Sequence, residues 1–267
     1  MILNFLSFSC PLLLASTGAL FSEYTGTLAL FLEGFINFSG FLTFYFTVLT
    51  GSVAAGLSLG MMTGLLLVLL LAWITEKFHA NQFIAALGMN LFFSSIISCI
   101  SSFAFKTRGV LTSPAFVFDV TNIEIISIVI TVILIATAIF VLIFTQPGIY
   151  FRITGTSSDV LKVKGVNPSG YRIAAWVVSA FFAFAAGSLL TLRISSFVPN
   201  ISSGKGWMAL ATVFLGKKKP WKICLYVLLF CAGDFIAANI QNYIPAIPSS
   251  ILLSFPYIIA VMLSCIK

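Results

Sequence analysis

Charged side chains are scarce in this sequence of 267 residues. Aspartate, glutamate, lysine and arginine make up only 8% of it, whereas 60% of the residues are hydrophobic. A soluble globular domain carries about 25% charged residues, because its surface faces water. This shortage excludes a soluble domain of ordinary composition and indicates a chain that faces lipid.

Residues and motifs for chemistry are also missing. The sequence has one histidine, His79, in a short loop, and its five cysteines are scattered along the chain. We therefore predict no metal site and no cofactor. Neither the Gly-x4-Gly-Lys-Ser/Thr loop that cradles ATP phosphates nor a His-Glu-x-x-His sequence occurs. The sequence thus predicts a protein that is not an enzyme.

Long apolar stretches make up most of the chain instead. A membrane-spanning helix needs roughly 20 mainly apolar residues, and backbone groups in lipid are satisfied only within helices or closed barrels. The stretches are too long and too uniformly apolar for barrel strands. We therefore predict an all-α polytopic membrane protein with about eight spans. They lie near residues 2–21, 27–50, 53–75, 82–104, 124–145, 172–192, 221–243 and 249–266.

A ninth apolar piece, residues 206–216, is too short to cross a bilayer comfortably. It predicts a half-span or re-entrant helix, which is tolerated where protein or a cavity covers it. No segment outside the stretches is long enough to form a soluble core. Residues 1–267 are therefore predicted to form a single transmembrane domain, with one sizeable polar segment at about 146–171.

The lysines and arginines test this layout. If the polar segment is cytoplasmic and the short piece crosses, ten basic residues lie inside and four outside, which is the usual inside bias. The inside set is Lys77, Arg152, Lys162, Lys164, Arg172, Lys217, Lys218, Lys219, Lys222 and Lys267. The outside set is Lys106, Arg108, Arg193 and Lys205. This layout places the N-terminus outside and the C-terminus inside.

A few polar residues fall inside the predicted spans. Glu33 and Asn37 are four residues apart, and Asp234 and Gln241 are seven apart, so each pair shares a helix face. Asn90 is the lone amide of its span. Such residues face the interior of a helix bundle, because burying them in lipid is costly. They predict either a polar path for a hydroxylated solute or hydrogen bonds that tie helices together.

The polar segment contains a predicted short helix. Ser157 and Ser158 can cap its start, and Gly165 can end it. A helix of this kind, parallel to the membrane and with apolar and basic faces, is able to dock in a groove of a cytoplasmic partner. The alternative interpretation is a basic loop held to anionic lipid.

Five segments resemble the permease subunits of bacterial ABC importers, in the branch that serves nucleosides and simple sugars. Residues 23–34 resemble that family's Ser-Glu-x-x-Gly-x-Leu-Asn-x-Gly-x-Glu-Gly stretch, and 80–91 its Ala-Asn-Gln block leading to an asparagine in mid-helix. Residues 165–171 are similar to its Gly-Ile-Asn and following tyrosine, 179–190 to its glycine-rich span, and 197–211 to its Pro-x-x-x-x-Gly-x-Gly-Phe-x-x-Ile-Ala block. Together they cover nearly the whole chain in order.

The resemblance implies a multi-pass permease of the bacterial cytoplasmic (inner) membrane. The partners that it implies are a cytoplasmic ATP-binding subunit, a second permease subunit in a heterodimer and an extracytoplasmic solute-binding lipoprotein. Besides these it implies membrane lipid, and no nucleic acid. The ATP-binding subunit is expected to dock on the cytoplasmic helix within 155–165. The expected coupling residues are Gly155, Asp159, Leu161, Lys162 and Gly165.

The resemblance also ranks the candidate solutes. Nucleosides come first, riboflavin second and simple sugars third, with Asn90, Asn37, Glu33, Asp234 and Gln241 as expected path residues. The rival class is a secondary transporter driven by an ion gradient. In that class Glu33 and Asp234 would be the proton or sodium carboxylates, and the two halves of the chain would show internal repeats.

Overall fold

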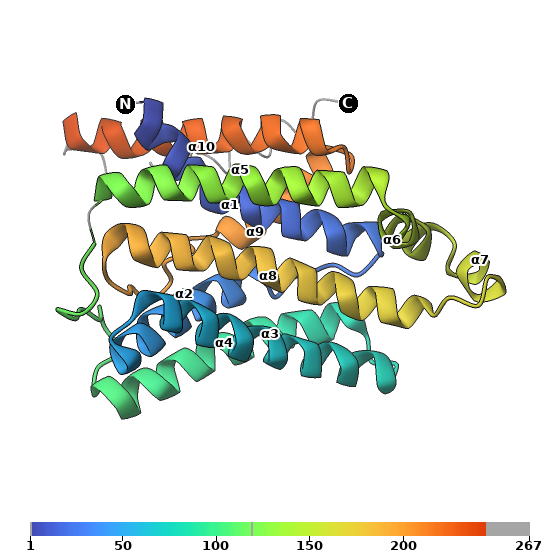
Figure 1. Ribbon diagram of the computed structural model, residues 1–267, viewed down its shortest axis with the longest axis horizontal. Coiled ribbons are helices and arrows are strands. Elements are labelled where there is room, and N and C mark those ends of the chain that lie inside the picture. The colour runs from blue at the N-terminus through green and yellow to red at the C-terminus, as the bar shows by residue number, and fades with distance from the viewer. Residues whose placement is uncertain (1, 119, 244–267) are drawn as a thin grey trace.

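A computed structural model of the chain describes residues 2–118 and 120–243 (Figure 1). Within that part the regular elements are helices, and one isolated β-bridge joins Leu111 to Phe197. The elements are α1 (Ile2–Tyr24), α2 (Leu32–Thr50), α3 (Val53–Lys77), α4 (Gln82–Ile100), the π-helical turn η1 (Ser101–Phe105), α5 (Val120–Phe144), α6 (Gln146–Thr156), α7 (Ser158–Val163), α8 (Pro168–Ile194), α9 (Lys205–Leu215) and α10 (Pro220–Tyr243).

Seven of these helices are long and apolar enough to cross a membrane, namely α1, α2, α3, α4 with η1, α5, α8 and α10. They confirm the predicted all-α polytopic class and seven of its spans. The predicted span at 249–266 lies outside the described residues. The short piece predicted at 206–216 is α9, an 11-residue helix. At 1.5 Å per residue it is about 16 Å long, roughly half the thickness of a bilayer core.

The start of α2 differs from the prediction. We expected a span from residue 27, but the helix begins at Leu32. Gly26 adopts φ 74°, a left-handed conformation that ends regular helix. The hydroxyl groups of Thr25 and Thr27 hydrogen-bond the Ser22 carbonyl and each other, which holds a turn after α1. Apolar composition alone gave no sign of this break.

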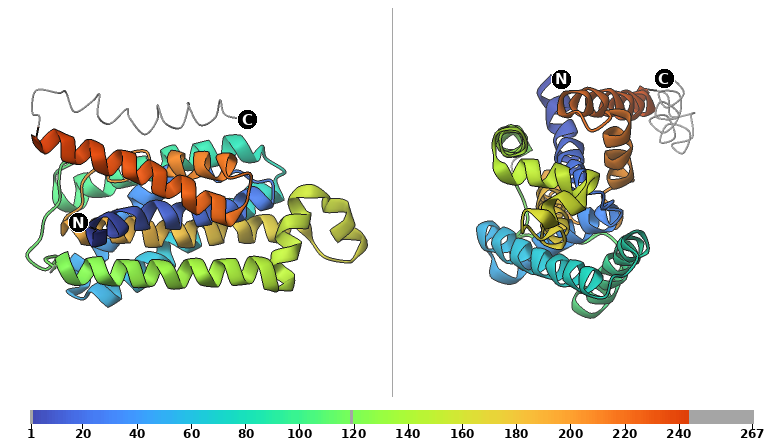
Figure 2. Two further views of the ribbon diagram at one scale, coloured as in Figure 1. Left: turned by 90° about the horizontal axis from the view of Figure 1, so that it is seen from above. Right: turned by 90° about the vertical axis from the view of Figure 1, so that its right-hand side faces the viewer.

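The helices form a core with flanks on either side. The apolar windows of α1, α2 and α8 are 72%, 78% and 61% buried, against 22% for those of α3, α4 and α5. Figure 2 shows α3 and α4 on one side of the bundle and α10 and α5 on other sides. α9 packs against α1, α2 and α10. The core helices therefore meet mainly protein, and the flanking helices present their apolar surfaces outward.

A glycine seam joins α3 to this core. Gly56, Gly60 and Gly64 are buried on one face of α3, as their four-residue spacing predicts. A Cβ atom at Gly60 would lie 3.4 Å from Leu42 of α2, and one at Gly64 would lie 3.2 Å from Phe35. The absence of side chains at these positions lets the two helices approach closely.

Basic residues gather at the end of the bundle from which α6 and α7 project, which we call the α6–α7 end (Figure 2). The end of α3, the start of α8 and the turn between α9 and α10 lie there too (Figure 1). These segments, with Lys164 just after α7 and Lys222 in the first turn of α10, carry nine of the ten basic residues predicted inside; Lys267 lies outside the described residues. Lys106, Arg108 and Arg193 lie at the opposite end, as predicted. Lys205 differs, because it begins α9 within the bundle.

Candidate functional site

Two helices begin inside the bundle rather than at its ends. The first turn of α2 packs against Asn90 of α4, and Phe31 just before it contacts Trp176 of α8. Each contact is eight residues from the start of its own helix at the α6–α7 end, or about 12 Å at 1.5 Å per residue. α9 starts against the same turn of α2, because a Cβ atom at Gly206 would lie 2.6 Å from the Glu33 Cα atom.

Glu33 joins these two helix starts. Its carboxylate accepts hydrogen bonds from Gly204 N at 2.8 Å and from Gly206 N at 2.7 Å, and a further short one from the Ser202 hydroxyl. The side chain is buried, with 9% exposure. Because the N-termini of α2 and α9 both carry partial positive charge, a carboxylate is stabilised here. Glu33 therefore supplies the capping oxygens that the start of α9 needs.

Asn37 and Asn90 extend this network. Asn37, one turn after Glu33, donates to the Glu33 carbonyl at 3.1 Å and accepts from Ser202 N at 2.9 Å. The Asn90 Oδ1 atom accepts from Gly34 N at 2.5 Å, which ties α4 to the first turn of α2. The structure thus brings Glu33, Asn37 and Asn90 together, and their polar groups bind protein. A role of these residues in a solute path stays a prediction.

The other two predicted path residues lie on α10. Asp234 interacts electrostatically with Lys205 at the start of α9. Phe8 of α1 lies below the same ammonium group, with its ring centroid 5.8 Å from the Lys205 Nζ atom. Gln241 belongs to α10, but its side chain lies outside the described residues. Asp234 is therefore near the start of α9 without joining the Glu33 network.

The predicted cytoplasmic segment folds into two helices rather than one. α6 was not predicted; it begins with Pro147 in its first turn, after Thr145 whose hydroxyl accepts from Gly148 N at 3.4 Å. Gly155, near the end of α6, lies against the turn between α1 and α2. A Cβ atom there would collide with the Tyr24 carbonyl oxygen and lie 2.9 Å from Gly26 N. This contact connects α6 to the chain that leads into α2.

α7 is the helix predicted near Ser157 and Ser158. It runs from Ser158 to Val163, and Gly165 follows with φ 74° as an end signal predicts. Ser157 stands at its N-cap position, but within the described residues its side chain makes no capping hydrogen bond. The predicted helix and its end are confirmed, and the predicted side-chain cap is not.

One face of α7 packs against the rest of the protein, and the other face is exposed. Leu161 is fully buried, so it holds α7 against the rest of the protein. Asp159 and Lys162 are exposed and form a salt bridge of 3.1 Å. Val163 is 89% exposed and Val160 is 47% exposed. The surface that α7 presents is therefore two valines flanked by an ion pair, and the sequence analysis missed the valines.

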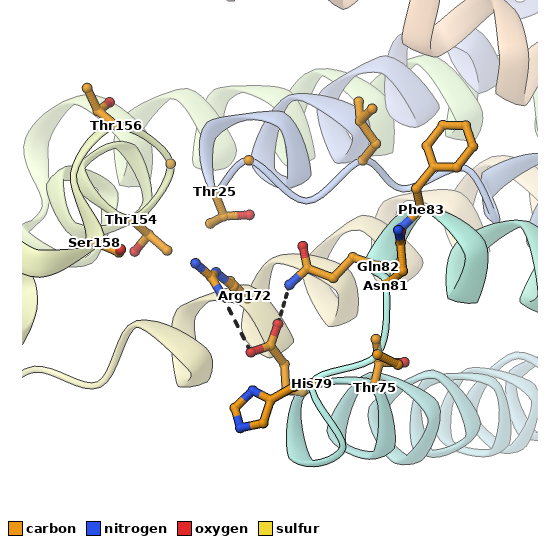
Figure 3. A pocket seen from close by; sticks show the side chains of 15 residues that line it. Thr25, Thr75, His79, Asn81, Gln82, Phe83, Thr154, Thr156, Ser158 and Arg172 are labelled. Atoms are coloured by element: carbon orange, nitrogen blue, oxygen red, sulfur yellow. Dashed lines mark hydrogen bonds and ion pairs between the residues drawn. The ribbon is translucent and has the colours of Figure 1, made fainter.

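A polar cavity of about 610 Å³ opens at the α6–α7 end (Figure 3). The turn after α1, the ends of α3 and α6, and the starts of α4, α7 and α8 surround it. Glu76 is part of its wall, with Arg172 Nη1 at 3.8 Å and Gln82 Nε2 at 2.5 Å from its carboxylate oxygens. Figure 3 shows Arg172 and Gln82 pointing toward the same carboxylate, with His79 beside them. Sequence reasoning did not single out this cluster.

The fold excludes a hydrolase site at one sequence match. Residues 56–60 match Gly-x-Ser-x-Gly, the pattern of a nucleophile held on a strand-to-helix turn. Here the pattern lies within α3, and the Ser58 hydroxyl donates to the Ala55 carbonyl at 3.1 Å. Among the described residues, no three His, Cys, Asp or Glu side chains are placed to hold a metal ion. The match is a helix-packing seam.

Comparison with known protein families gives a match over residues 1–264. The matching family is described as the permease component of the branched-chain amino acid transport system. The chain belongs to this family. The family is one of transport permeases, which confirms the resemblance noted from the sequence motifs. Together with the apolar helices, membership makes this chain a multi-pass protein of the inner membrane.

Two curated relatives match almost the whole chain. The nucleoside ABC transporter permease protein NupC of Lactococcus lactis is 26% identical, over 97% of this chain and 89% of its own length. The guanosine ABC transporter permease protein NupQ of Bacillus subtilis is 27% identical, over 96% and 88%. Among solved structures, PsaBC from Streptococcus pneumoniae in complex with Fab superposes with a TM-score of 0.57 at 14% identity, covering 98% of this chain and 90% of that one. That likeness concerns the fold alone.

Proposed function

We propose that this chain forms the translocation path of an ATP-driven ABC importer for a nucleoside-like solute. The observation that carries the proposal is the family match over residues 1–264, together with two nearly full-length relatives that are named for nucleoside and guanosine transport. A purine nucleoside is the first candidate, riboflavin the second and a simple sugar the third. All three are hydroxylated solutes.

The proposed assembly contains four kinds of subunit. A second, different permease subunit completes the membrane part, and an extracytoplasmic lipoprotein delivers solute to it. Cytoplasmic ATP-binding subunits dock on α7 and drive the alternation of the path. The projection of α6 and α7 beyond the bundle, with two exposed valines, supports this docking site (Figure 2).

A reconstitution experiment tests the function. The chain is purified with its partner subunits, placed in liposomes with the solute-binding lipoprotein, and supplied with ATP and tritiated guanosine, riboflavin or ribose. We expect uptake of guanosine that stops when the ATP-binding subunit is inactivated by mutation. Uptake that survives this inactivation but collapses with an ionophore would overturn the proposal in favour of a secondary transporter.

The geometry of Glu33 already favours the ATP-driven class. A coupling carboxylate in an ion-driven transporter has to exchange its ion with solution. Both carboxylate oxygens of Glu33 instead accept hydrogen bonds from Ser202, Gly204 and Gly206 in a buried site. This carboxylate is engaged in joining two helices.

A substitution on α7 tests the docking surface. We expect Val163→Asp to reduce ATP-driven uptake at least tenfold, because it places a charge in the centre of the proposed interface. A loss of about 1.4 kcal/mol of binding free energy corresponds to a tenfold loss of affinity. Val117→Asp is the matched control: Val117 is 71% exposed in the loop at the opposite end of the bundle. Uptake and co-purification of the ATP-binding subunit are measured for both. Equal results for the two variants would remove α7 as the docking site.

A further inference from the structure

The cavity at the α6–α7 end has the size and lining of a small-molecule site. Its volume of about 610 Å³ falls within the roughly 300–1,000 Å³ typical of ligand pockets. Polar residues dominate its wall, among them Thr25, Thr75, Gln82 and Ser158. A wall of hydroxyl and amide groups, with Thr25, Thr75 and Thr154 buried, suits a ligand with several hydroxyl or carbonyl groups.

The charges in this cavity cancel. Glu76 and Arg172 face each other at 3.8 Å, and Gln82 also donates to Glu76 at 2.5 Å. The acid of this cluster is therefore already engaged by a guanidinium and an amide group. A cavity with a balanced ion pair favours a neutral solute over an anion or a cation.

A second, much smaller pocket adjoins the cavity and shares part of its wall, and we call it the extension; a polar group with no protein partner lines it. The extension shares Thr75, Glu76 and Arg172 with the cavity and reaches Trp176 of α8. Trp176 is 3% exposed, and its indole Nε1 finds no hydrogen-bond partner among the described residues. A buried N–H group normally has a partner, because leaving it unpaired is costly. The extension has room for about one oxygen atom, from water or from a solute.

The wall of the cavity includes the segment proposed to receive the ATP-binding subunit. Thr154, Gly155 and Thr156 at the end of α6 and Ser158 at the start of α7 line one side. The α3–α4 loop and the start of α8 line the other. A displacement of α6 and α7 relative to the bundle therefore changes the shape of the cavity directly.

We infer that this cavity is the inner solute site of the permease, from which a neutral, hydroxylated solute is released to the cytoplasm. The Trp176 indole N–H donates to a carbonyl or hydroxyl oxygen of the solute. Thr75 accepts from a solute hydroxyl, because its own proton is donated to the Leu71 carbonyl at 2.8 Å. Movement of α6 and α7 opens the wall and lets the solute leave. This inference rests on the proposed function and adds the residues that contact the solute.

A pair of tryptophan substitutions tests the inference in the reconstituted transporter. Trp176→Phe removes the indole N–H and retains an aromatic ring. We expect uptake of the probe to slow about three- to tenfold, the effect of losing one hydrogen bond. The probe is whichever of tritiated guanosine, riboflavin and ribose the unmodified transporter imports. Trp221→Phe is the matched control, because Trp221 is 65% exposed at the start of α10, outside the cavity wall.

A thiol-protection experiment tests independently whether the solute occupies the cavity. In a background with the five native cysteines replaced, Ser158→Cys lies on the cavity wall and Ser157→Cys lies beside it, outside that wall. Inside-out vesicles are treated with a membrane-impermeant maleimide, with and without the probe. We expect the probe to slow labelling at position 158 and leave position 157 unchanged.

The outcomes separate this inference from the proposed function. Normal uptake by Trp176→Phe together with equal labelling at both positions would overturn the cavity as a solute site, while ATP-driven transport would stand. Slowed uptake without protection would also overturn it, because Trp176 would then act only through folding. Failure of the unmodified assembly to import any of the three probes with ATP would contradict the proposed function instead.

Discussion

Replacing Glu33 with alanine is expected to prevent assembly of a stable permease. The substitution leaves Gly204 N, Gly206 N and the Ser202 hydroxyl without their acceptor at a buried site. Each unsatisfied buried donor costs about 1–3 kcal/mol, so the expected loss is a large part of the stability of a typical protein. Thermal unfolding in detergent and the amount of monodisperse protein after purification measure this effect.

Two conservative changes sharpen this prediction. Glu33→Gln keeps one acceptor oxygen but places an amide N–H₂ near one of the backbone donors, so we expect an intermediate loss. Glu23→Gln makes the same chemical change in a salt bridge with Lys218, whose side chain is 46% exposed. Such bridges contribute about 0–1 kcal/mol, so this control should remain stable. If Glu33→Ala unfolds at the same temperature as the Glu23→Gln control, the joining role of Glu33 is wrong.

Adding one methyl group at Gly155 is expected to uncouple ATP hydrolysis from transport. In Gly155→Ala the new Cβ atom meets the Tyr24 carbonyl and Gly26 N, which are backbone atoms with little freedom to move. The end of α6 must therefore shift away from the turn that leads into α2. We expect at least a tenfold loss of ATP-driven uptake while the complex still hydrolyses ATP.

A second glycine provides the control for this change. Gly170 lies in the first turn of α8 at the same end of the bundle, and no atom of the described residues outside its own helix turn lies within 4 Å of a Cβ atom built there. Gly170→Ala should therefore transport normally. Coupled uptake and ATP hydrolysis are measured side by side in the same liposomes. Normal uptake by Gly155→Ala would show that the contact between α6 and the α1–α2 turn transmits no motion.

Most of the spans could be predicted because lipid imposes a simple rule on composition. α1, α3, α5 and α8 appear in the sequence as long apolar stretches, and the structure has them within a few residues. The late start of α2 was missed because the segment between Gly26 and Phe31 is as apolar as the helix that follows. Hydropathy does not distinguish a buried turn from a helix when protein covers both.

α6 was missed for a different reason. Its sequence is polar, and we read residues 146–171 as one loop with a single short helix. A local signal was present, because Thr145 followed by Pro147 is typical of a helix start. Turn and cap chemistry, applied to the polar segment, would have predicted this helix without the structure.

The candidate site was only partly visible in the sequence. The four-residue spacing of Glu33 and Asn37 correctly placed them on one helix face, but their partner Ser202 lies 165 or more residues away along the chain. The cavity around Glu76 and Arg172 is assembled from six segments, so no single stretch of sequence carries its pattern. Contacts of this kind depend on how the helices pack, and local sequence patterns do not predict that packing.

The Glu33 carboxylate has a consequence for solutes that carry phosphate. Helix N-termini that meet halfway through a membrane protein are an attractive place for an anion from solution. In this chain the Glu33 carboxylate already neutralises the partial positive charge at the N-termini of both α2 and α9. A nucleotide near this point would gain nothing from either dipole and would still lose its hydration. At this point in the bundle the chain therefore favours an uncharged solute over its phosphorylated form.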